Sequence, residues 1–168
     1  IAWGMLLESL MREESWLAAT FGFAESVEFR HALAVLRLLE MRRQAATLQY
    51  ELEFHSGKLT TGIGERYAEL MTEAVRVQFD EASCLREVSD DFRPANVLRA
   101  AAFEAQLRDF LKTQFGSHWW ASRKAGELLI DLWNTGQQYS VDELAAMIGL
   151  GELDFDFLTT EPLDLFSN

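Results

Sequence analysis

The sequence predicts an all-α fold, a multi-helix bundle of about six helices with one long central helix. Only two prolines occur in 168 residues, and long stretches of the helix formers Ala, Leu, Glu and Arg lie between breaks marked by glycine. No segment shows the alternation of a half-buried strand. With 49% hydrophobic residues the chain can build one packed core, and we expect a single domain over residues 1–168.

The first two predicted helices cover residues 2–20, with a possible interruption near Glu14, and residues 26–55, with Ser26 as N-cap. The second helix carries a seam, a row of residues at alternating steps of three and four. We expect this seam to pack against other helices. Its members are His31, Ala34, Leu38, Met41, Ala45, Leu48, Leu52 and His55.

The remaining helices are predicted from local start and stop signals. Pro94 suits the first turn of a helix that ends before Gly116, and Ser140 with Glu143 three residues later forms a capping box. The acidic tail, residues 151–168, is expected to pack on the bundle as short turns. The four helices are predicted over residues 65–79, 94–115, 122–134 and 140–149.

The charge of the chain excludes several partners. Its 27 acidic and 15 basic residues give a net charge of −12, which repels nucleic acid and anionic lipid. No apolar run approaches the roughly 20 residues that span a bilayer. The single cysteine, Cys84, cannot form an internal disulfide. We therefore expect a cytoplasmic protein that binds neither nucleic acid nor membrane.

Metal-ligand motifs are absent from the sequence. It contains no H-E-x-x-H and no C-x-x-C motif, and no Glu-x-x-His pattern on paired helices. His31 and His55 lie on one predicted helix at a separation of about 36 Å, too far apart to share an ion. His118 precedes two adjacent tryptophans, which are more typical of structural anchors than of a site. We expect no metal site within these residues.

Arg99 is the residue least easily explained by packing. It shares a helix face with Phe103, Leu107 and Phe110, so a guanidinium is predicted on an apolar stripe. One interpretation is an internal ion pair with a carboxylate, which we favour. The other is a cation presented to a peptide carbonyl or carboxylate in a cleft.

One further charge pair is predicted on the same helix. Glu104 and Arg108 are four residues apart, a spacing that is typical of an ordinary surface pair on a helix.

Several segments resemble the C-terminal helical part of zinc metallopeptidases of the thimet oligopeptidase and oligoendopeptidase F family, in particular its bacterial relatives. The resemblance covers most of the chain. The segments that carry it are RRQAATLQYELEFH (42–55), FRPANVLRAAAFEAQLR (92–108), WW (119–120) and AGELL (125–129).

The resemblance implies a larger helical shell around a deep cleft, in which zinc is bound by H-E-x-x-H and a glutamate on a following helix. It places all three ligands before Ile1, in an upstream zinc-binding lobe of the parent protein. It implies hydrolysis of short peptides by that parent, with zinc as cofactor and this part inactive alone. The sequence opens as an uncapped amphipathic helix, and we therefore also expect a C-terminal piece of a longer protein.

The candidate substrate-binding residues are Phe92, Asn96, Arg99 and His55, and no catalytic residue is predicted. The chain departs from the family at Arg93 and Val97, where relatives tend to carry tyrosines that help to bind the tetrahedral intermediate. The alternative function is a non-catalytic helical module for protein–protein interaction or oligomerisation. A concave face that gathers the four candidate residues would favour the cleft, and a flat exposed apolar patch would favour the module.

Overall fold

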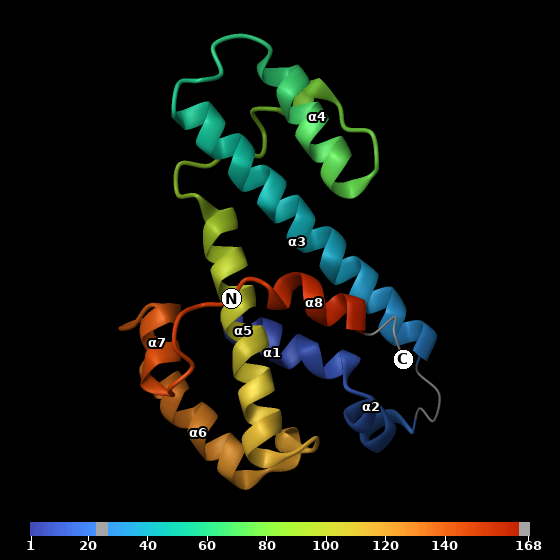
Figure 1. Ribbon diagram of the computed structural model, residues 1–168, viewed down its shortest axis with the longest axis vertical. Coiled ribbons are helices and arrows are strands. Elements are labelled where there is room, and N and C mark those ends of the chain that lie inside the picture. The colour runs from blue at the N-terminus through green and yellow to red at the C-terminus, as the bar shows by residue number, and fades with distance from the viewer. Residues whose placement is uncertain (23–26, 165–168) are drawn as a thin grey trace. The chain divides into compact units, whose positions relative to one another are not determined.

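The fold is all-α, as the sequence predicts (Figure 1). The computed structural model describes residues 1–22 and 27–164, with side chains described up to residue 160. Helices are the only regular elements in these residues, and the longest is α3 (Val27–His55). The N-cap predicted at Ser26 lies outside the described residues. No helix in the described part of the chain is long and apolar enough to cross a membrane.

The chain divides into two compact units. Unit 1 consists of Ile1–Ala34 and Arg99–Asn168, and unit 2 of Val35–Leu98. The boundaries fall within two helices, α3 and α5 (Arg93–Phe115), so each of these helices contributes residues to both units.

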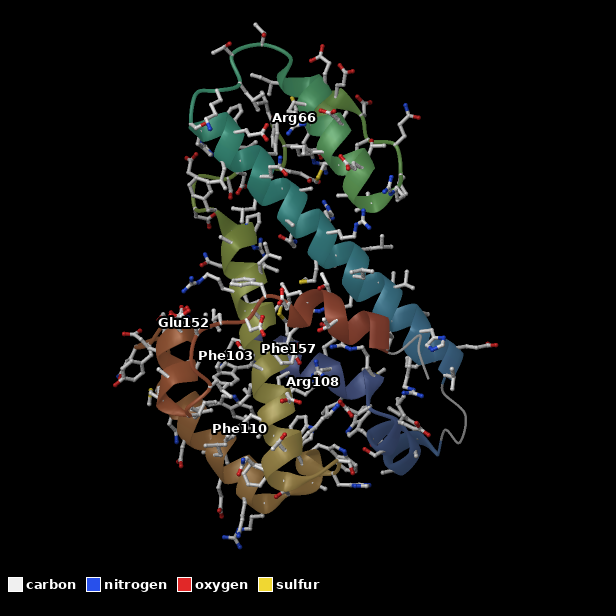
Figure 2. The ribbon with its side chains drawn as sticks, in the orientation of Figure 1. Arg66, Phe103, Arg108, Phe110, Glu152 and Phe157 are labelled. Carbon is white, nitrogen blue, oxygen red and sulfur yellow. The ribbon has the colours of Figure 1, made fainter. Side chains whose placement is uncertain are left out.

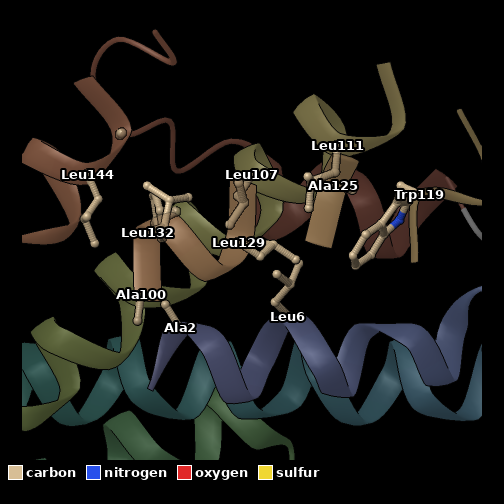
Figure 3. Close-up of a cluster of buried hydrophobic side chains, with 12 residues drawn as sticks. Ala2, Leu6, Ala100, Leu107, Leu111, Trp119, Ala125, Leu129, Leu132 and Leu144 are labelled. Atoms are coloured by element: carbon tan, nitrogen blue, oxygen red, sulfur yellow. The ribbon is translucent and has the colours of Figure 1, made fainter. Parts of the chain in front are cut away.

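The centre of unit 1 is the part of α5 that follows Arg99. Every residue from Ala100 to Arg108 is buried, so the helix is enclosed on all sides. The helices α1 (Ala2–Ser9), α6 (Arg123–Asn134) and α7 (Val141–Met147) pack against it (Figure 1). Figure 3 shows the apolar cluster that results, with side chains Ala2, Leu6, Ala100, Leu107, Leu111, Trp119, Ala125, Leu129, Leu132 and Leu144.

The pair Glu104 and Arg108 is buried, so the prediction of a surface pair is wrong. Glu104 is 1% exposed and Arg108 is 7% exposed. Arg108 Nε donates a 2.8 Å hydrogen bond to Glu104 Oε1, and Glu13 and Lys112 extend this charged group. Because α5 is enclosed on all sides here, both side chains of the pair lie in the interior of unit 1. Figure 2 labels Arg108 on α5.

The first predicted helix is divided in the structure. It consists of α1, a 3₁₀ turn over Leu10–Arg12, and α2 (Glu14–Phe21). Glu13 has extended backbone angles, which separates the two α-helices close to the interruption expected at Glu14. Gly22 then ends α2 with a φ of +69°, a conformation that glycine adopts without steric cost.

Local capping signals set the later helices of unit 1. Ser140 accepts from the backbone N–H of Glu143, whose carboxylate accepts in return from the Ser140 N–H at 2.7 Å, so the predicted capping box is confirmed. The segment after α7 is bound to the side chain of Gln106. Its Nε2 donates to the Glu152 carbonyl and its Oε1 accepts from the Asp154 N–H, both at 3.1 Å. The tail then forms α8 (Phe157–Asp164), a helix that the sequence analysis did not predict.

Unit 2 consists mainly of the second half of α3 and of α4 (Ile63–Val75), which lies alongside it (Figure 1). A 3₁₀ turn over Glu81–Ser83 follows α4. The core of this unit is small. Its buried members are Ala46, Tyr50, Tyr67, Leu70 and Met71.

The seam predicted along α3 holds only in its first half. Ala34 and Met41 are buried, but Ala45 and Leu52 are exposed. The side of α3 that faces α4 carries Ala46 and Tyr50 instead, one residue or about 100° around the helix. In the second half of the predicted seam, Ala45 and Leu52 are exposed and Leu48 is half-buried, and these three residues form an apolar stripe on unit 2.

Candidate functional site

The four predicted site residues do not belong to one unit. His55, Phe92 and Asn96 lie in unit 2, whereas Arg99 lies in unit 1. We therefore describe the three residues of unit 2 as one candidate site and Arg99 by itself.

His55 and Phe92 are in contact. Their ring centroids are 5.3 Å apart at an interplanar angle of 65°. Phe92 has a φ of +48°, a left-handed conformation that residues other than glycine adopt only when their surroundings hold them. The His55 Nε2 lies 3.1 Å from the Ser89 carbonyl oxygen, which can only accept, so Nε2 carries the proton and donates. The predicted neighbours are thus brought together at the last residue of α3.

A buried carboxylate, Glu51, bonds to the segment that joins the turn at Glu81–Ser83 to α5 and that ends at Phe92. Glu51 is fully buried, and its Oε1 accepts from the backbone N–H of Ser89 at 3.0 Å. The Ser89 hydroxyl lies 3.1 Å from the same Oε1 and 2.7 Å from Asp91 Oδ1. The Ser89 hydroxyl also lowers the pKa of Asp91. The sequence analysis missed Glu51, because no motif distinguishes it from the other glutamates of α3.

Asn96 lies one turn beyond Phe92 and is exposed to solvent. Its amide carries both donors and an acceptor. It is therefore accessible to a ligand of unit 2.

Arg99 forms the internal ion pair that the first interpretation predicts. Its Nη2 bonds to Oδ2 of Asp142, in the first turn of α7. Both side chains remain partly exposed, at 43% and 44%, so the guanidinium is not buried as its apolar stripe suggested. The pair connects α5 to α7 within unit 1. Arg99 is thus engaged with Asp142, and a structural role accounts for it.

Two buried tyrosines, Tyr50 and Tyr67, belong to the core of unit 2. The rings of Tyr50 and Tyr67 are 5.3 Å apart, and neither hydroxyl has a hydrogen-bond partner of normal geometry. Burial raises the pKa of both phenols to about 12, and nearby Glu87 adds to the effect on Tyr67. Both hydroxyls therefore stay protonated at neutral pH and act as neutral groups in the core.

An apolar depression of about 300 Å³ lies on the exposed stripe of α3. Its wall is mainly carbon, from Ala45, Leu48 and Leu52 of α3 and Leu98 of α5. Leu52 is 53% exposed and lies one turn before His55 on the same helix. Gln49, Glu53 and Lys58 complete the lining of the depression as its polar rim.

Of the two charged groups at the rim, Glu53 has hydrogen-bond partners and Lys58 has none among the described residues. Arg66 donates two 2.8 Å hydrogen bonds to Glu53, from Nε and Nη2, and Gln49 adds a third at 3.0 Å. These bonds hold the pKa of Glu53 at about 2, so its carboxylate is ionised and fully engaged. Arg66, labelled on α4 in Figure 2, also bonds to Glu69. Lys58 makes no hydrogen bond or ion pair with the residues that the structure describes and is exposed.

The residues that the structure describes contain no set of side chains that could bind zinc. Among the residues that the structure describes, no group of three His, Cys, Asp or Glu side chains lies close enough to hold a metal ion. We therefore assign no step to a metal on these residues.

Comparisons with known proteins give no match. No family model, no curated protein and no solved structure matches this chain. The depression and the His55–Phe92 contact are therefore interpreted from their own geometry.

Proposed function

We propose that this chain is the peptide-binding part of a zinc-dependent oligopeptidase, and that the depression on unit 2 takes an apolar side chain of the peptide. The zinc and the groups that activate water belong to an upstream lobe of the parent protein, and this part by itself does not catalyse hydrolysis. The observation that carries the proposal is the apolar depression with a polar rim, one helical turn before His55, whose ring contacts Phe92.

The composition of the depression supports peptide binding. Sites for small ligands are concave, mostly apolar and carry a few polar groups that fix orientation. The volume of about 300 Å³ lies at the lower end for such sites and suits one or two residues of a peptide. Exposed Asn96 and the amide oxygen of Gln49, whose Nε2 donates to Glu53, are groups that can bond to a peptide backbone.

A second candidate function is the helical interaction module. The exposed apolar stripe of α3, with Ala45 and Leu52, favours it, since such a stripe on one helix can bind a partner helix. The net charge of −12 opposes association between copies of the chain. A partner of this kind would bind along the whole stripe, whereas a short peptide needs only the depression.

The test is the binding of short peptides to the purified chain, measured by fluorescence anisotropy. Leu52→Glu puts a charge into the wall of the depression and is expected to weaken binding by about tenfold or more, since a buried unpaired charge is costly. Leu36→Glu makes the same change at a more exposed position of α3, outside the depression, and is expected to have little effect.

Equal loss in both variants would contradict a peptide site in the depression, because Leu36 lies about 160° around α3 from Leu52. No peptide binding at all would also contradict the proposal. The zinc part is tested separately on the encoding gene. The proposal expects an H-E-x-x-H motif and a glutamate-bearing helix before Ile1. A gene without them would rule out the peptidase.

A further inference from the structure

Lys58 is a cation at the rim of the depression, and its charge favours a part of a peptide that carries a carboxylate. The depression is lined by carbon except for Gln49, Glu53 and Lys58. Glu53 is occupied by Arg66 and Gln49, and Gln49 donates to Glu53. Lys58 is thus the charged group at this rim that makes no hydrogen bond or ion pair with the described residues.

The position of Lys58 keeps its ammonium available to a ligand. It lies in the loop after α3, next to Gly57, which has a φ of +71°. The Lys58 charge contributes to the low pKa of Glu53, so the two groups are close, but it is the smallest of the contributions. The carboxylate of Glu53 already accepts three hydrogen bonds, from Arg66 and Gln49, whereas the ammonium of Lys58 is exposed at the rim of an apolar depression.

We infer that the depression binds the last residue of a peptide, with its apolar side chain against Leu48, Leu52 and Leu98 and its terminal carboxylate on Lys58. This inference rests on the proposed peptide binding. The chemistry of the ligand is an aliphatic group joined to a carboxylate a few atoms away. A free C-terminal Leu or Met provides both within one residue, which matches the small volume of the depression.

The experiment compares three labelled peptides by fluorescence anisotropy, each with the same fluorophore at the N-terminus. They are Ala-Ala-Ala-Leu as the free acid, the same peptide as the C-terminal amide, and amidated Ala-Ala-Leu-Asp. We expect the free acid to bind about fivefold more tightly than either amide, the size of one partly exposed ion pair.

Variants at Lys58 test whether this side chain causes the preference for the free acid. Lys58→Met is expected to weaken binding of the free acid by about fivefold and to leave the amide unchanged, while Lys58→Arg retains the preference. Lys124→Met makes the same change of net charge at an exposed position of α6 and is expected to leave binding of all three peptides unchanged.

The outcomes separate this inference from the proposed function. If the free acid and its amide bind equally, or if Lys58→Met weakens both alike, the role of Lys58 is wrong while peptide binding stands. If amidated Ala-Ala-Leu-Asp binds as tightly as the free acid, the carboxylate comes from a side chain and the assignment of the last residue is overturned. If none of the peptides binds, the proposed function fails together with the inference.

Discussion

At the scale of single residues, Glu53 is a surface carboxylate with a strongly lowered pKa. Its pKa is about 2 instead of 4.5, and the first cause is the pair of hydrogen bonds from Arg66. The unfolded chain takes up a proton near pH 4.5, whereas the folded chain resists protonation until about pH 2. This interaction therefore stabilises the fold above pH 4.5, and its contribution is lost as the pH falls from 4.5 towards 2.

Arg66→Met is predicted to destabilise the protein in a pH-dependent way. At pH 6 we expect a loss of about 1 kcal/mol in the free energy of unfolding, because the pair is partly exposed and screened by solvent. Towards pH 2.5 the difference between wild type and variant should shrink. Urea denaturation followed by far-UV circular dichroism measures it at each pH.

Arg123→Met is the matched control for this prediction. It removes an exposed pair with Glu127 on α6 and is expected to change stability little at either pH. A loss in Arg66→Met that is equal at pH 6 and pH 2.5 would contradict the assignment of the pKa shift to Arg66.

At the scale of elements, α3 is apolar on two faces. One face, with Ala46 and Tyr50, packs on α4, while the other, with Ala45, Leu48 and Leu52, lines the depression. Both faces obey helical spacing, but only the face with Ala45, Leu48 and Leu52 belongs to the seam predicted from the sequence. Only one of them packs against α4, and this leaves the other available for a ligand.

Two helical glycines provide an element-scale prediction. An added Cβ at Gly64 in α4 would lie 3.0 Å from the Cβ of Glu81 and 3.2 Å from its carbonyl oxygen, whereas at Gly126 in α6 it would meet no atom within 4 Å. Gly64→Ala is therefore expected to destabilise by about 1 kcal/mol or more despite its better helix propensity. Gly126→Ala is expected to stabilise by about 0.5–1 kcal/mol.

Thermal unfolding of the two variants checks this prediction, since both changes add one methyl group to a helix. Opposite shifts of the melting temperature are expected. A rise in both would mean that α4 and the turn at Glu81–Ser83 separate without cost, contrary to their close approach in the structure.

At the scale of the whole molecule, the two units have cores of different size. Among the described residues, the main cluster of unit 1 contains twelve buried side chains and that of unit 2 contains five. Because stability grows with the apolar area that is buried, unit 2 should open at a lower denaturant concentration than unit 1.

The tryptophans allow the two units to be followed separately. All five lie in unit 1, whereas helical signal comes from both units. Circular dichroism at 222 nm should therefore begin to fall at a lower urea concentration than the shift of tryptophan emission. Met71→Ala should shift the early loss of the circular dichroism signal to a lower urea concentration and leave the midpoint of the tryptophan emission change unaltered. Coincident transitions would show instead that the chain unfolds as one cooperative unit.

Much of the fold follows from the sequence because the responsible interactions span few residues. The capping box at Ser140 and Glu143 and the helix end before Gly116 (φ +82°) involve neighbours within one turn. The ring contact between His55 and Phe92, by contrast, joins residues far apart in the sequence. Only the resemblance suggested both as site residues, and their contact is a result of the structure.

The sequence by itself determined that the chain is helical and where most helices begin and end. Tertiary structure alone decided which face is covered. It put the Glu104–Arg108 pair inside unit 1, paired Arg99 with Asp142, and left Leu48 and Leu52 in an open depression. The physical reason is that helix formation depends on neighbours within a turn, whereas burial depends on which distant segment packs against a given face.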